Sequence, residues 1–474
     1  MKKNTFLFSC ALLALGGPCA RAAEKMNVIF LDICSTRADH FGTYGYNRDT
    51  TPNMDSFGKS GAVFENAMSE GSWCLPSYAS LLTGHVPEVH GLYTNLPAGK
   101  LPSFETTLAA ELGQAGYKTA LFSGGVFLLP EWGLTKGFDN YTNAFSTANP
   151  NRIPAPFQDN LQGVLGWVRQ NKSAEKPFFL FATIDDLHTP YHSEDPDKYD
   201  PGYEGIVHDP DILGVPFSRA YNGQEAGYPE GMKKKVEEFK SDPRHLKHMI
   251  AHYDASLNSV DKQIGAFMDK MREMGMDKNT VFIISADHGE LLGEKGLINH
   301  TESLYEPVTH VPLLVKDPSN PASHGKRLKQ LVQRIDLMPT ILEMAGVSQY
   351  GLGLQGTSFV PLLKNPQAPW REYAFARSRR NIPFMKGKDA MIDERIVRDN
   401  CWKLHHYLYK TSWELYDICS DPLETTDLAA TRPEITARLA FQLLKNLEET
   451  RPHQPGPPDG LTRTLIEKPP APKN

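Results

Sequence analysis

Short, continuous apolar runs constrain the fold of this chain more than any other feature of its sequence. The first run, Asn27–Cys34, reads Asn-Val-Ile-Phe-Leu-Asp-Ile-Cys and has the length of a single strand. Apolar runs without polar alternation are typical of strands that are buried on both faces of a parallel sheet. Similar runs recur along the chain at Thr119–Ser123, Pro177–Thr183, Thr280–Ser285 and Val311–Val315.

Helical patterns lie between these runs. The longest is His248–Met274, in which apolar residues recur at helical spacing along one stripe. Shorter helices are expected at Phe104–Ala115 and Gln158–Gln170. The alternation of strand and helix predicts an α/β fold, namely a doubly wound, mostly parallel sheet with helices on both faces. In such sheets, functional residues gather at the carboxyl ends of the strands.

The N-terminal segment has the pattern of an export signal. Lys2 and Lys3 precede the apolar stretch Phe6–Leu15, and Ala20-Arg21-Ala22 resembles a cleavage site. We expect residues 1–22 to be a signal peptide and the protein to be exported, either periplasmic or secreted. The apolar stretch is too short for a mature transmembrane helix, and no other segment is apolar enough to span a membrane.

The remainder is expected to contain a catalytic domain at residues 25–369, a smaller subdomain at 370–451 and a Pro-rich tail at 452–474. Within the first, residues 195–245 are rich in Pro, Gly, Asp and Lys and predict a long irregular excursion over the site. The smaller subdomain is predicted to be α+β with antiparallel strands. Its expected elements are hairpin strands and a terminal helix, at Arg395–Tyr409, Trp413–Ile418 and Glu434–Arg451.

Charge and cysteine content narrow the function classes. The formal charge of −6 and the absence of long blocks of one sign argue against nucleic-acid binding. Cys10 and Cys19 would leave with the signal peptide, and the four cysteines that remain do not make a disulfide scaffold. Cys401 and Cys419 either pair in an oxidising compartment or stay as buried thiols.

Cys74 leads a proline-containing turn that runs into a short apolar helix, Cys74–Gly84. The first N–H groups of a helix are unpaired and the helix dipole is positive there, so this end attracts anions. A nucleophile at this position can hold and attack a sulfate or phosphate ester. Taken alone, the cysteine is better explained as a small buried core residue, and only the rest of the chain decides otherwise.

Other polar residues follow predicted strands. Asp287-His288-Gly289-Glu290 comes directly after a buried strand, and its carboxylate and imidazole groups are suited to bind a cation. His188 closes another strand, and His300 lies in a Gly-rich loop. Because strand ends meet at one edge of the sheet, we expect these histidines to lie near each other.

With these motifs in this order, the chain resembles the type I, formylglycine-type sulfatase family of the alkaline phosphatase superfamily. The resemblance runs from Asn27 to about Leu428. Each motif alone is weak, but their shared order is specific. They are Arg37–Tyr46, Asp49–Asp55, Cys74–Gly84, Gly133–Asp139, His188–Tyr191, Ser285–Glu290, Tyr305–Pro312, Asp336–Thr340, Glu414–Asp417 and Asp421–Glu424.

In this family the leading cysteine is converted to formylglycine, whose hydrate attacks the sulfur atom. The resemblance implies that Cys74 is the nucleophile precursor and that Asp287 and His288 bind a divalent cation. The family usually holds calcium, with zinc and magnesium as alternatives, and the cation polarises the ester oxygens. A formylglycine-generating or an anaerobic sulfatase-maturating enzyme is the implied maturation partner.

The resemblance also assigns roles around the nucleophile. His188 would contact the sulfate or protonate the leaving group, and His300 would assist from its loop. Ser77 and Tyr78, close to the nucleophile in the same turn, are expected to contact the substrate. Tyr78 departs from the family, which places an arginine there that helps the converting enzyme recognise the site.

The end of the first strand departs from the family as well. Where relatives carry metal-binding aspartates, this chain has Cys34 and Ser35, and Asp32 precedes them on the same strand face. Three alternatives follow. Asp32 reaches the metal through a shift in register, Cys34 is a ligand and favours zinc, or the metal site is weak or lost. Positions where relatives place sulfate-binding lysines are also not cationic here.

These features make a sulfuric ester hydrolase the leading functional hypothesis, with an extracellular sulfated small molecule or glycan as substrate. The runner-up is a phosphoester or phosphonate ester hydrolase of the same superfamily. A catalytically silent relative that binds a sulfated glycan is the third hypothesis, favoured by the substitutions at Cys34 and Tyr78.

Overall fold

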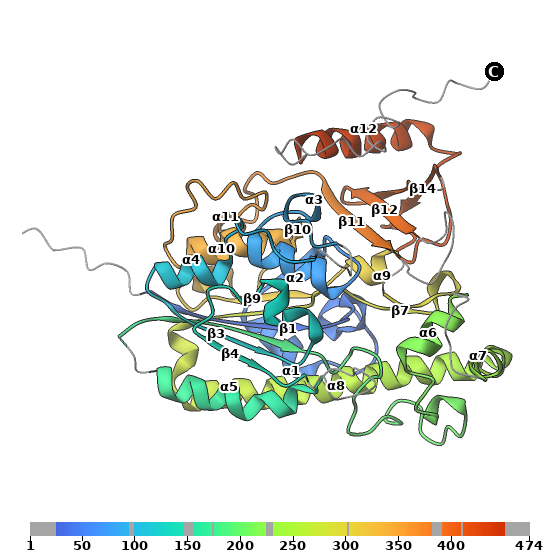
Figure 1. The fold of residues 1–474 in the computed structure, drawn as a ribbon, viewed down its shortest axis with the longest axis horizontal. Coiled ribbons are helices and arrows are strands. Elements are labelled where there is room, and N and C mark those ends of the chain that lie inside the picture. Colours follow the sequence, from blue (N-terminus) through green and yellow to red (C-terminus); the bar gives the residue numbers. More distant parts are fainter. Residues whose placement is uncertain are drawn as a thin grey trace, which may run out of the picture.

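The computed structural model describes residues 25–93, 99–145, 155–172, 175–223, 231–300, 303–381, 391–408 and 411–450. Most of these residues form a large sheet with helices on both faces, and a second sheet lies beside it (Figure 1). The predicted signal peptide and Pro-rich tail lie outside the described residues. Among the described helices, none combines the length and the apolar character that a membrane crossing needs.

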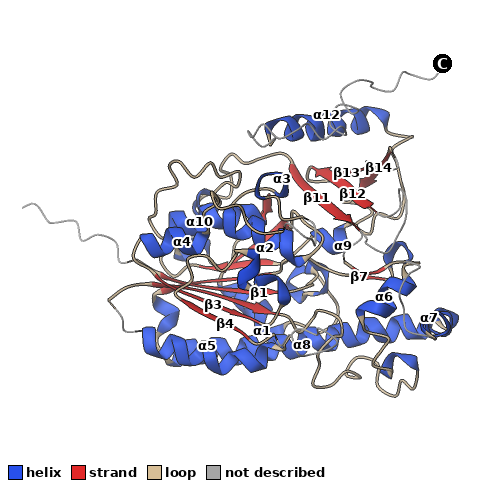
Figure 2. Ribbon diagram, in the orientation of Figure 1, coloured by secondary structure: helices blue, strands red, loops and turns tan. Residues whose placement is uncertain are grey.

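The large sheet, whose strands are among those drawn red in Figure 2, has eight strands in the order β10-β2-β9-β6-β1-β5-β3-β4. β9 is antiparallel to both of its neighbours, and every other pair in the sheet is parallel. The prediction of a mostly parallel α/β sheet is therefore confirmed. Its strands are β1 (Asn27–Ile33), β2 (Ala62–Met68), β3 (Lys118–Ser123), β4 (Asn140–Asn143), β5 (Phe178–Ile184), β6 (Thr280–Ser285), β9 (Leu313–Lys316) and β10 (Arg327–Gln333).

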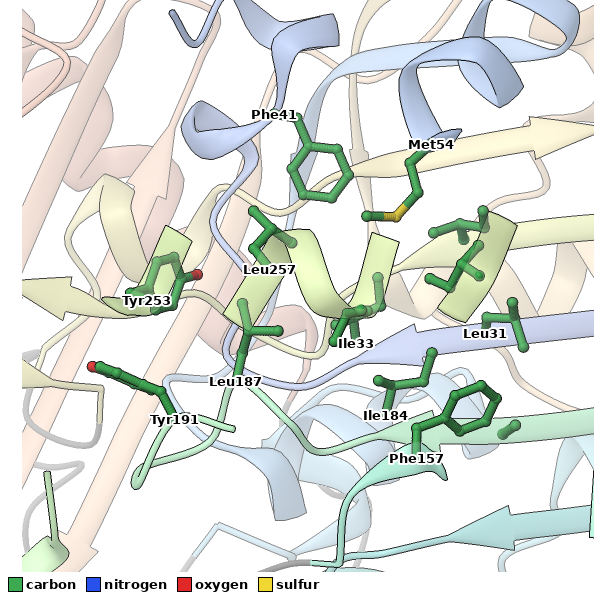
Figure 3. Close-up of a cluster of buried hydrophobic side chains, with 14 of the residues drawn as sticks. Leu31, Ile33, Phe41, Met54, Phe157, Ile184, Leu187, Tyr191, Tyr253 and Leu257 are labelled. Atoms are coloured by element: carbon green, nitrogen blue, oxygen red, sulfur yellow. The ribbon is translucent and has the colours of Figure 1, made fainter. Parts of the chain in front are cut away.

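Alternation along β1 separates two apolar cores. Ile29, Leu31 and Ile33 face one core, whereas Val28 and Phe30 face the other, because successive side chains of a strand point to opposite faces. Figure 3 shows part of the first core, where side chains of β1 and β5 meet α8. The first core is covered by α1 (Pro52–Ser60), α5 (Phe157–Asn171) and α8 (Pro243–Glu273), and the second by α2 (Cys74–Thr83), α4 (Leu108–Gln114) and α10 (Leu337–Met344).

The second sheet is a four-stranded antiparallel meander, and α12 packs on it. The single strand predicted at Arg395–Tyr409 is wrong, because a turn at residues 399–401 divides it between two strands. Cys401 and Cys419 form a disulfide, which decides between the two alternatives left open by the sequence. The elements are β11 (Ala374–Asn381), β12 (Met391–Arg398), β13 (Trp402–Tyr407), β14 (Ser412–Asp417) and α12 (Pro433–Glu449).

The excursion predicted at 195–245 is more ordered than expected, since it contains α6 (Val215–Tyr221) and α7 (Met232–Ser241). Asn222, at the end of α6, exchanges hydrogen bonds with the backbone of Ile298, which belongs to the loop of His300. The excursion therefore borders the predicted site. The remaining short α-helices and strands among the described residues are α3 (Pro87–His90), α9 (Glu306–Thr309), α11 (Val360–Lys364), β7 (Leu291–Leu292) and β8 (Ile298–Asn299).

Candidate active site

Cys74 is the first residue of α2, so the proline-containing turn that it was expected to lead is the first turn of the helix itself. No side chain caps this end of the helix, and the whole helix is buried. The Cys74 side chain itself is only 4% exposed. The cysteine therefore lies at a helix N-terminus inside the molecule, where unpaired N–H groups and the helix dipole favour a bound anion.

Asp287 and His288 follow the end of β6 and are fully buried. Asp287 Oδ1 accepts hydrogen bonds from the N–H groups of Ser35, at 3.0 Å, and His288, at 2.8 Å. Ser35 has a φ of 56°, a left-handed conformation that directs its N–H toward this carboxylate. Gly289 is required next, because a Cβ there would lie 2.0 Å from the carbonyl oxygen of Pro307.

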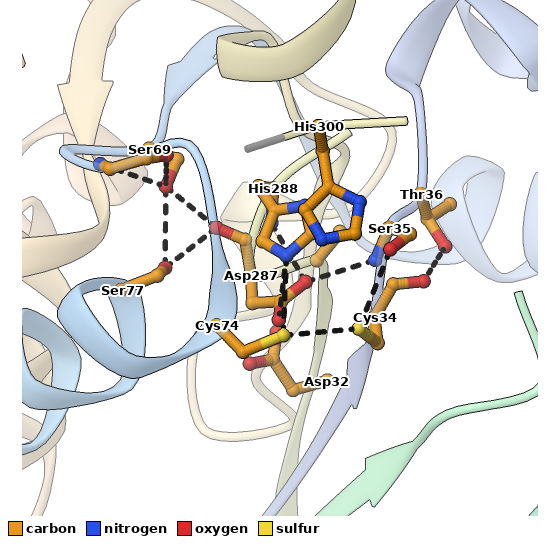
Figure 4. Close-up of polar contacts among 12 residues, drawn as sticks. Asp32, Cys34, Ser35, Thr36, Ser69, Cys74, Ser77, Asp287, His288 and His300 are labelled. Atoms are coloured by element: carbon orange, nitrogen blue, oxygen red, sulfur yellow. Dashed lines mark hydrogen bonds and ion pairs between the residues drawn. The ribbon is translucent and has the colours of Figure 1, made fainter. Parts of the chain in front are cut away.

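Four side chains converge at this point from the ends of β1 and β6 and from α2 (Figure 4). Cys34 Sγ lies 3.6 Å from Cys74 Sγ, and Cys74 Sγ lies 3.4 Å from His288 Nε2. Together with Asp287, these residues offer ligand atoms that all lie within 4.8 Å of one another. Asp287 Oδ2 is buried, lies 3.3 Å from His288 Nε2 and has no hydrogen-bond partner among the described residues, so an acceptor is available for a cation. We call this group the thiol cluster.

Both further histidines predicted from the sequence lie beside the thiol cluster. The ring of His300 lies 4.2 Å from that of His288 and 5.5 Å from that of His188, centroid to centroid. Glu290 Oε2 is 2.7 Å from His300 Nδ1, and the carbonyl oxygen of Thr189 is 2.8 Å from His188 Nδ1. These contacts fix the orientation of both rings.

Asp32 lies apart from the thiol cluster, in a buried ion pair. Its two oxygens accept from Arg334 Nη1 at 2.8 Å and Nη2 at 2.7 Å, and Nη1 also donates to the carbonyl oxygen of Ala286. Both side chains are at most 1% exposed. Among the described residues, it is Cys34 and not Asp32 that joins the group able to hold a metal.

Ser77 and Tyr78 are both buried beside the nucleophile position. Ser77 Oγ donates to the carbonyl oxygen of Asp287 at 2.6 Å, so this hydroxyl supports the metal-binding turn. The Tyr78 hydroxyl is buried without a hydrogen-bond partner among the described residues. Its ring packs edge-on against Phe181, at a centroid distance of 6.3 Å.

Burial dominates the acid–base properties of the site. A hydrogen bond from Cys34 lowers the pKa of Cys74, but burial and the charges of Asp287 and Asp185 outweigh it and raise the pKa to about 12. Burial lowers the pKa of His288 to about 4. The thiol of Cys74 is therefore protonated at neutral pH, and the imidazole of His288 is neutral and suited to bind a metal.

The sequence reasoning missed several buried polar groups around the site. Arg37 Nη1 donates to the carbonyl oxygen of Glu290 at 3.2 Å, and burial raises the pKa of Glu290 to about 8. Asp185 follows β5 and accepts from the N–H of Gly124 at 3.1 Å. The sequence held a signal for three of these residues. Motifs already identified contain Arg37 and Glu290, and Asp185 lies between the predicted strand that ends at Thr183 and the motif that begins at His188. Arg334 had no such signal.

Comparison with known proteins decides the family. The sulfatase family model matches residues 26–347. The chain belongs to the sulfatase family. A second model, for the C-terminal region of N-sulphoglucosamine sulphohydrolase, matches residues 293–453. Members of this family are hydrolases that act on sulfate esters, and their fold is that of the alkaline phosphatase-like superfamily.

Relatives of this sulfatase cover nearly its whole length. The chain is 26% identical to human (Homo sapiens) N-sulphoglucosamine sulphohydrolase, with 95% of each chain covered. It is 23% identical to an N-acetylglucosamine-6-O-sulfatase of Bacteroides thetaiotaomicron, covering 95% of this chain and 91% of the relative.

Solved structures share its fold. A protein in complex with its substrate D-glucosamine-2-N,6-O-disulfate matches with a TM-score of 0.70 at 20% identity, over 91% of this chain and 99% of the other. A phosphonate monoester hydrolase of Agrobacterium radiobacter matches with a TM-score of 0.69 at 18% identity, over 90% and 96%.

Proposed function

We propose that the protein is an exported sulfuric ester hydrolase that acts on a sulfated glycan, with Cys74 as the precursor of its nucleophile. The convergence of Cys74, Cys34, Asp287 and His288 at the buried start of α2 carries this proposal. A pKa near 12 makes the plain thiol of Cys74 a poor nucleophile at neutral pH. Conversion to formylglycine replaces that thiol with an aldehyde whose hydrate carries hydroxyl groups.

The conversion needs a partner enzyme. The Cβ–S bond of Cys74 breaks and a C=O bond forms with an oxygen atom taken from water. Sulfur leaves as hydrogen sulfide, and two electrons and two protons pass to an oxidant held by the maturation enzyme. Cys74 becomes buried on folding. We therefore propose that conversion precedes folding, by either a formylglycine-generating or an anaerobic sulfatase-maturating enzyme.

The donors of the thiol cluster fit zinc better than calcium. Calcium takes six to eight oxygen ligands, whereas the cluster offers sulfur, nitrogen and one carboxylate. Zinc is bound by thiolate, imidazole and carboxylate groups, and three protein ligands with one open position are usual in catalytic sites. We assign Cys34, Asp287 and His288 to that set. When bound, the cation supplies Lewis-acid polarisation of the ester oxygens.

The surrounding histidines are suited to move protons. The contact of His188 Nδ1 with the Thr189 carbonyl oxygen leaves its Nε2 for the substrate, and burial lowers the pKa of His188 in the free protein. A bound sulfate ester is anionic and favours the protonated imidazole, which then protonates the leaving oxygen. Glu290 holds His300 in place for a supporting role.

A sulfated glucosamine unit is the substrate class best supported by the relatives. The C-terminal model and the human relative are both named for N-sulphoglucosamine, and the match to the latter covers 95% of each chain. The Bacteroides relative is named for N-acetylglucosamine carrying a 6-O-sulfate. We propose a glucosamine residue with an N- or 6-O-sulfate.

Mass spectrometry of protein from the native host tests the proposal directly. Trypsin releases Cys74 in the peptide of residues 60–100, and conversion lowers its mass by about 18 Da relative to the thiol. An intact thiol would rule out the formylglycine mechanism. A second experiment measures how Tyr78 affects the conversion. A synthetic peptide of residues 70–84 and its Tyr78→Arg variant are each given to a formylglycine-generating enzyme, and their conversion rates are compared. The variant restores the family residue and should be converted faster.

Substrate assays separate the second candidate function. Release of inorganic sulfate from N- or 6-O-sulfated glucosamine supports the sulfatase, and Cys74→Ala should abolish it. Preferred hydrolysis of a phosphonate monoester by protein with an intact Cys74 thiol would favour the phosphonate hydrolase, whose structural relatives share the fold. Binding of the sulfated sugar without turnover would favour the silent relative.

A further inference from the structure

A second group of metal-binding side chains lies away from the thiol cluster, on the excursion. Asp197 comes from the loop after β5, and His208 ends a short 3-10 helix, Ile206–His208. His248 lies in the second turn of α8. One ligand atom of each residue falls within 4.8 Å of the others. Three segments that are separate in the sequence therefore bring a carboxylate and two imidazoles together.

The spacing of these atoms suits coordination better than hydrogen bonding. Asp197 Oδ1 lies 3.3 Å from His248 Nε2 and 3.6 Å from His208 Nε2. Good hydrogen bonds of this type are about 2.9–3.0 Å long. Ligands bound tetrahedrally at about 2.0–2.1 Å from zinc are about 3.3 Å apart. Within the described part of the chain, Asp197 Oδ1 is also buried without a hydrogen-bond partner, although the residue as a whole is half-buried.

Neighbouring groups hold His248 in the orientation that a metal requires. His248 is 1% exposed, and its Nδ1 lies 3.2 Å from Asp200 Oδ2. A carboxylate on the far nitrogen of a metal-binding histidine fixes the tautomer and raises the basicity of the ligand. The ring of Tyr203 stacks on His248 at a centroid distance of 3.7 Å, and the Tyr203 hydroxyl is 2.6 Å from His245 Nδ1.

His208 is the most adaptable of the three residues. Its side chain is 43% exposed, and its Nε2 lies 3.1 Å from the carbonyl oxygen of Tyr203. Coordination through Nε2 replaces this hydrogen bond with a stronger interaction, and the exposed ring has room to adjust. Its exposed edge leaves a position for water as the fourth ligand.

We propose that Asp197, His208 and His248 bind a zinc ion that is independent of the active-site metal, with Asp200 supporting His248. The ion joins the excursion to α8. Tyr191, which follows His188 by three residues, packs on His252 and Tyr253 of the same helix. The zinc ion therefore fixes the segment between His188 and Asp197 to α8, the helix against which this segment packs.

Zinc titration of the full-length protein tests this site. His208→Ala should bind one zinc ion fewer than the wild type, or should bind the second zinc ion at least tenfold more weakly than the wild type does. Asp200→Asn should weaken the same site about 10- to 100-fold. Both variants keep Cys34, Asp287 and His288, so any difference from the wild type reports the second site alone. Binding to both variants within twofold of the wild type would overturn the proposal.

A matched control and a second measurement guard against misfolding. His324→Ala removes a histidine outside both clusters, whose Nε2 lies 3.1 Å from the backbone carbonyl oxygen of Asp317, and the variant should bind zinc as the wild type does. In wild-type protein, zinc should slow amide hydrogen exchange across residues 195–208, and this protection should be absent in His208→Ala. If zinc slowed amide hydrogen exchange equally in the wild type and in His208→Ala, the proposed zinc site would be refuted, even if the variant unfolded more readily.

Discussion

The buried ion pair between Asp32 and Arg334 gives the sharpest test of which residues serve the metal and which serve the fold. Asp32 stands near the position of the family's metal ligands, yet both of its oxygens accept from Arg334. If this pair is structural, Arg334→Met alone leaves an uncompensated carboxylate inside the protein. The double variant Asp32→Leu/Arg334→Met removes both charges and fills the space with apolar groups.

The two variants should differ widely in stability. Removing one partner of a buried pair costs about 3–5 kcal/mol, because the remaining charge is desolvated without compensation. Both side chains are at most 1% exposed, so water cannot offset this cost. With about 2 °C lost per kcal/mol in a large domain, the melting temperature should fall by roughly 6–10 °C. The double variant should lie within about 2 kcal/mol of the wild type, since apolar replacement of buried pairs is often neutral.

Thermal unfolding and zinc titration together provide the assay. The double variant should keep the zinc affinity of the thiol cluster within a fewfold, because Cys34, Asp287 and His288 are unchanged. Arg371→Met is the matched control, since it removes an arginine–aspartate pair in which the arginine is 18% exposed and should cost less. Loss of zinc binding at the thiol cluster in a folded double variant would show that Asp32 is a ligand. If the double variant lost as much stability as Arg334→Met, the argument that removing both charges avoids the cost of an unpaired carboxylate would be refuted.

Three further predictions follow from single features. Burial raises the pKa of Glu70 from 4.5 to about 7, so the folded state keeps a proton that the unfolded state releases, and stability falls by on the order of 3 kcal/mol as the pH rises through this range. Glu70→Gln should remove that part of the slope in urea unfolding at pH 5 and 8, and an unchanged slope would contradict it. The disulfide of Cys401 and Cys419 closes a loop with a separation of 18 residues, so replacing both by serine should lower the free energy of unfolding by about 3 kcal/mol; an equal urea midpoint would argue against this. Asp287→Asn should lose active-site zinc and sulfatase activity together while the protein stays folded, and retention of both by equilibrium dialysis and sulfate release would disprove its assignment as a ligand.

The centre of the large sheet was predictable because β1, β5 and β6 are buried along their whole length. Runs such as Asn27–Cys34 and Thr280–Ser285 are apolar throughout, and the strands observed there agree within a residue. β10 (Arg327–Gln333) lies at the edge of the sheet and has alternating exposed and buried residues at its start, so it lacks this signal. The turn at residues 399–401 was missed because the apolar pattern continues on both sides of it.

The candidate site was predictable wherever its residues follow strands within a motif. Asp287 and His288 lie beside Cys34 because the carboxyl ends of β6 and β1 are adjacent, and the start of α2 brings Cys74 to the same place. The role of Asp32 was not predictable, since its partner Arg334 lies 302 residues away. Strand periodicity places Asp32 and Cys34 on one face, but only the three-dimensional structure shows which of them has a partner.

The charge balance of the site bears on how the proposed sulfatase chemistry would work without the lysines that the family resemblance leads us to expect. Asp32 and Arg334 neutralise each other. A divalent cation would be balanced by the carboxylate of Asp287 and the thiolate of Cys34, so the metal centre would carry no excess charge to offset an anionic ester. Under the proposed mechanism, the remaining compensation would come from the N-terminus of α2 and the imidazoles of His188 and His300. A lysine at His188 would supply the same charge, but its ordinary pKa lies far above neutral pH. An imidazole that has protonated the leaving oxygen is left neutral and can then accept the proton of the remaining hydroxyl of the nucleophile, so histidine would serve both halves of the reaction.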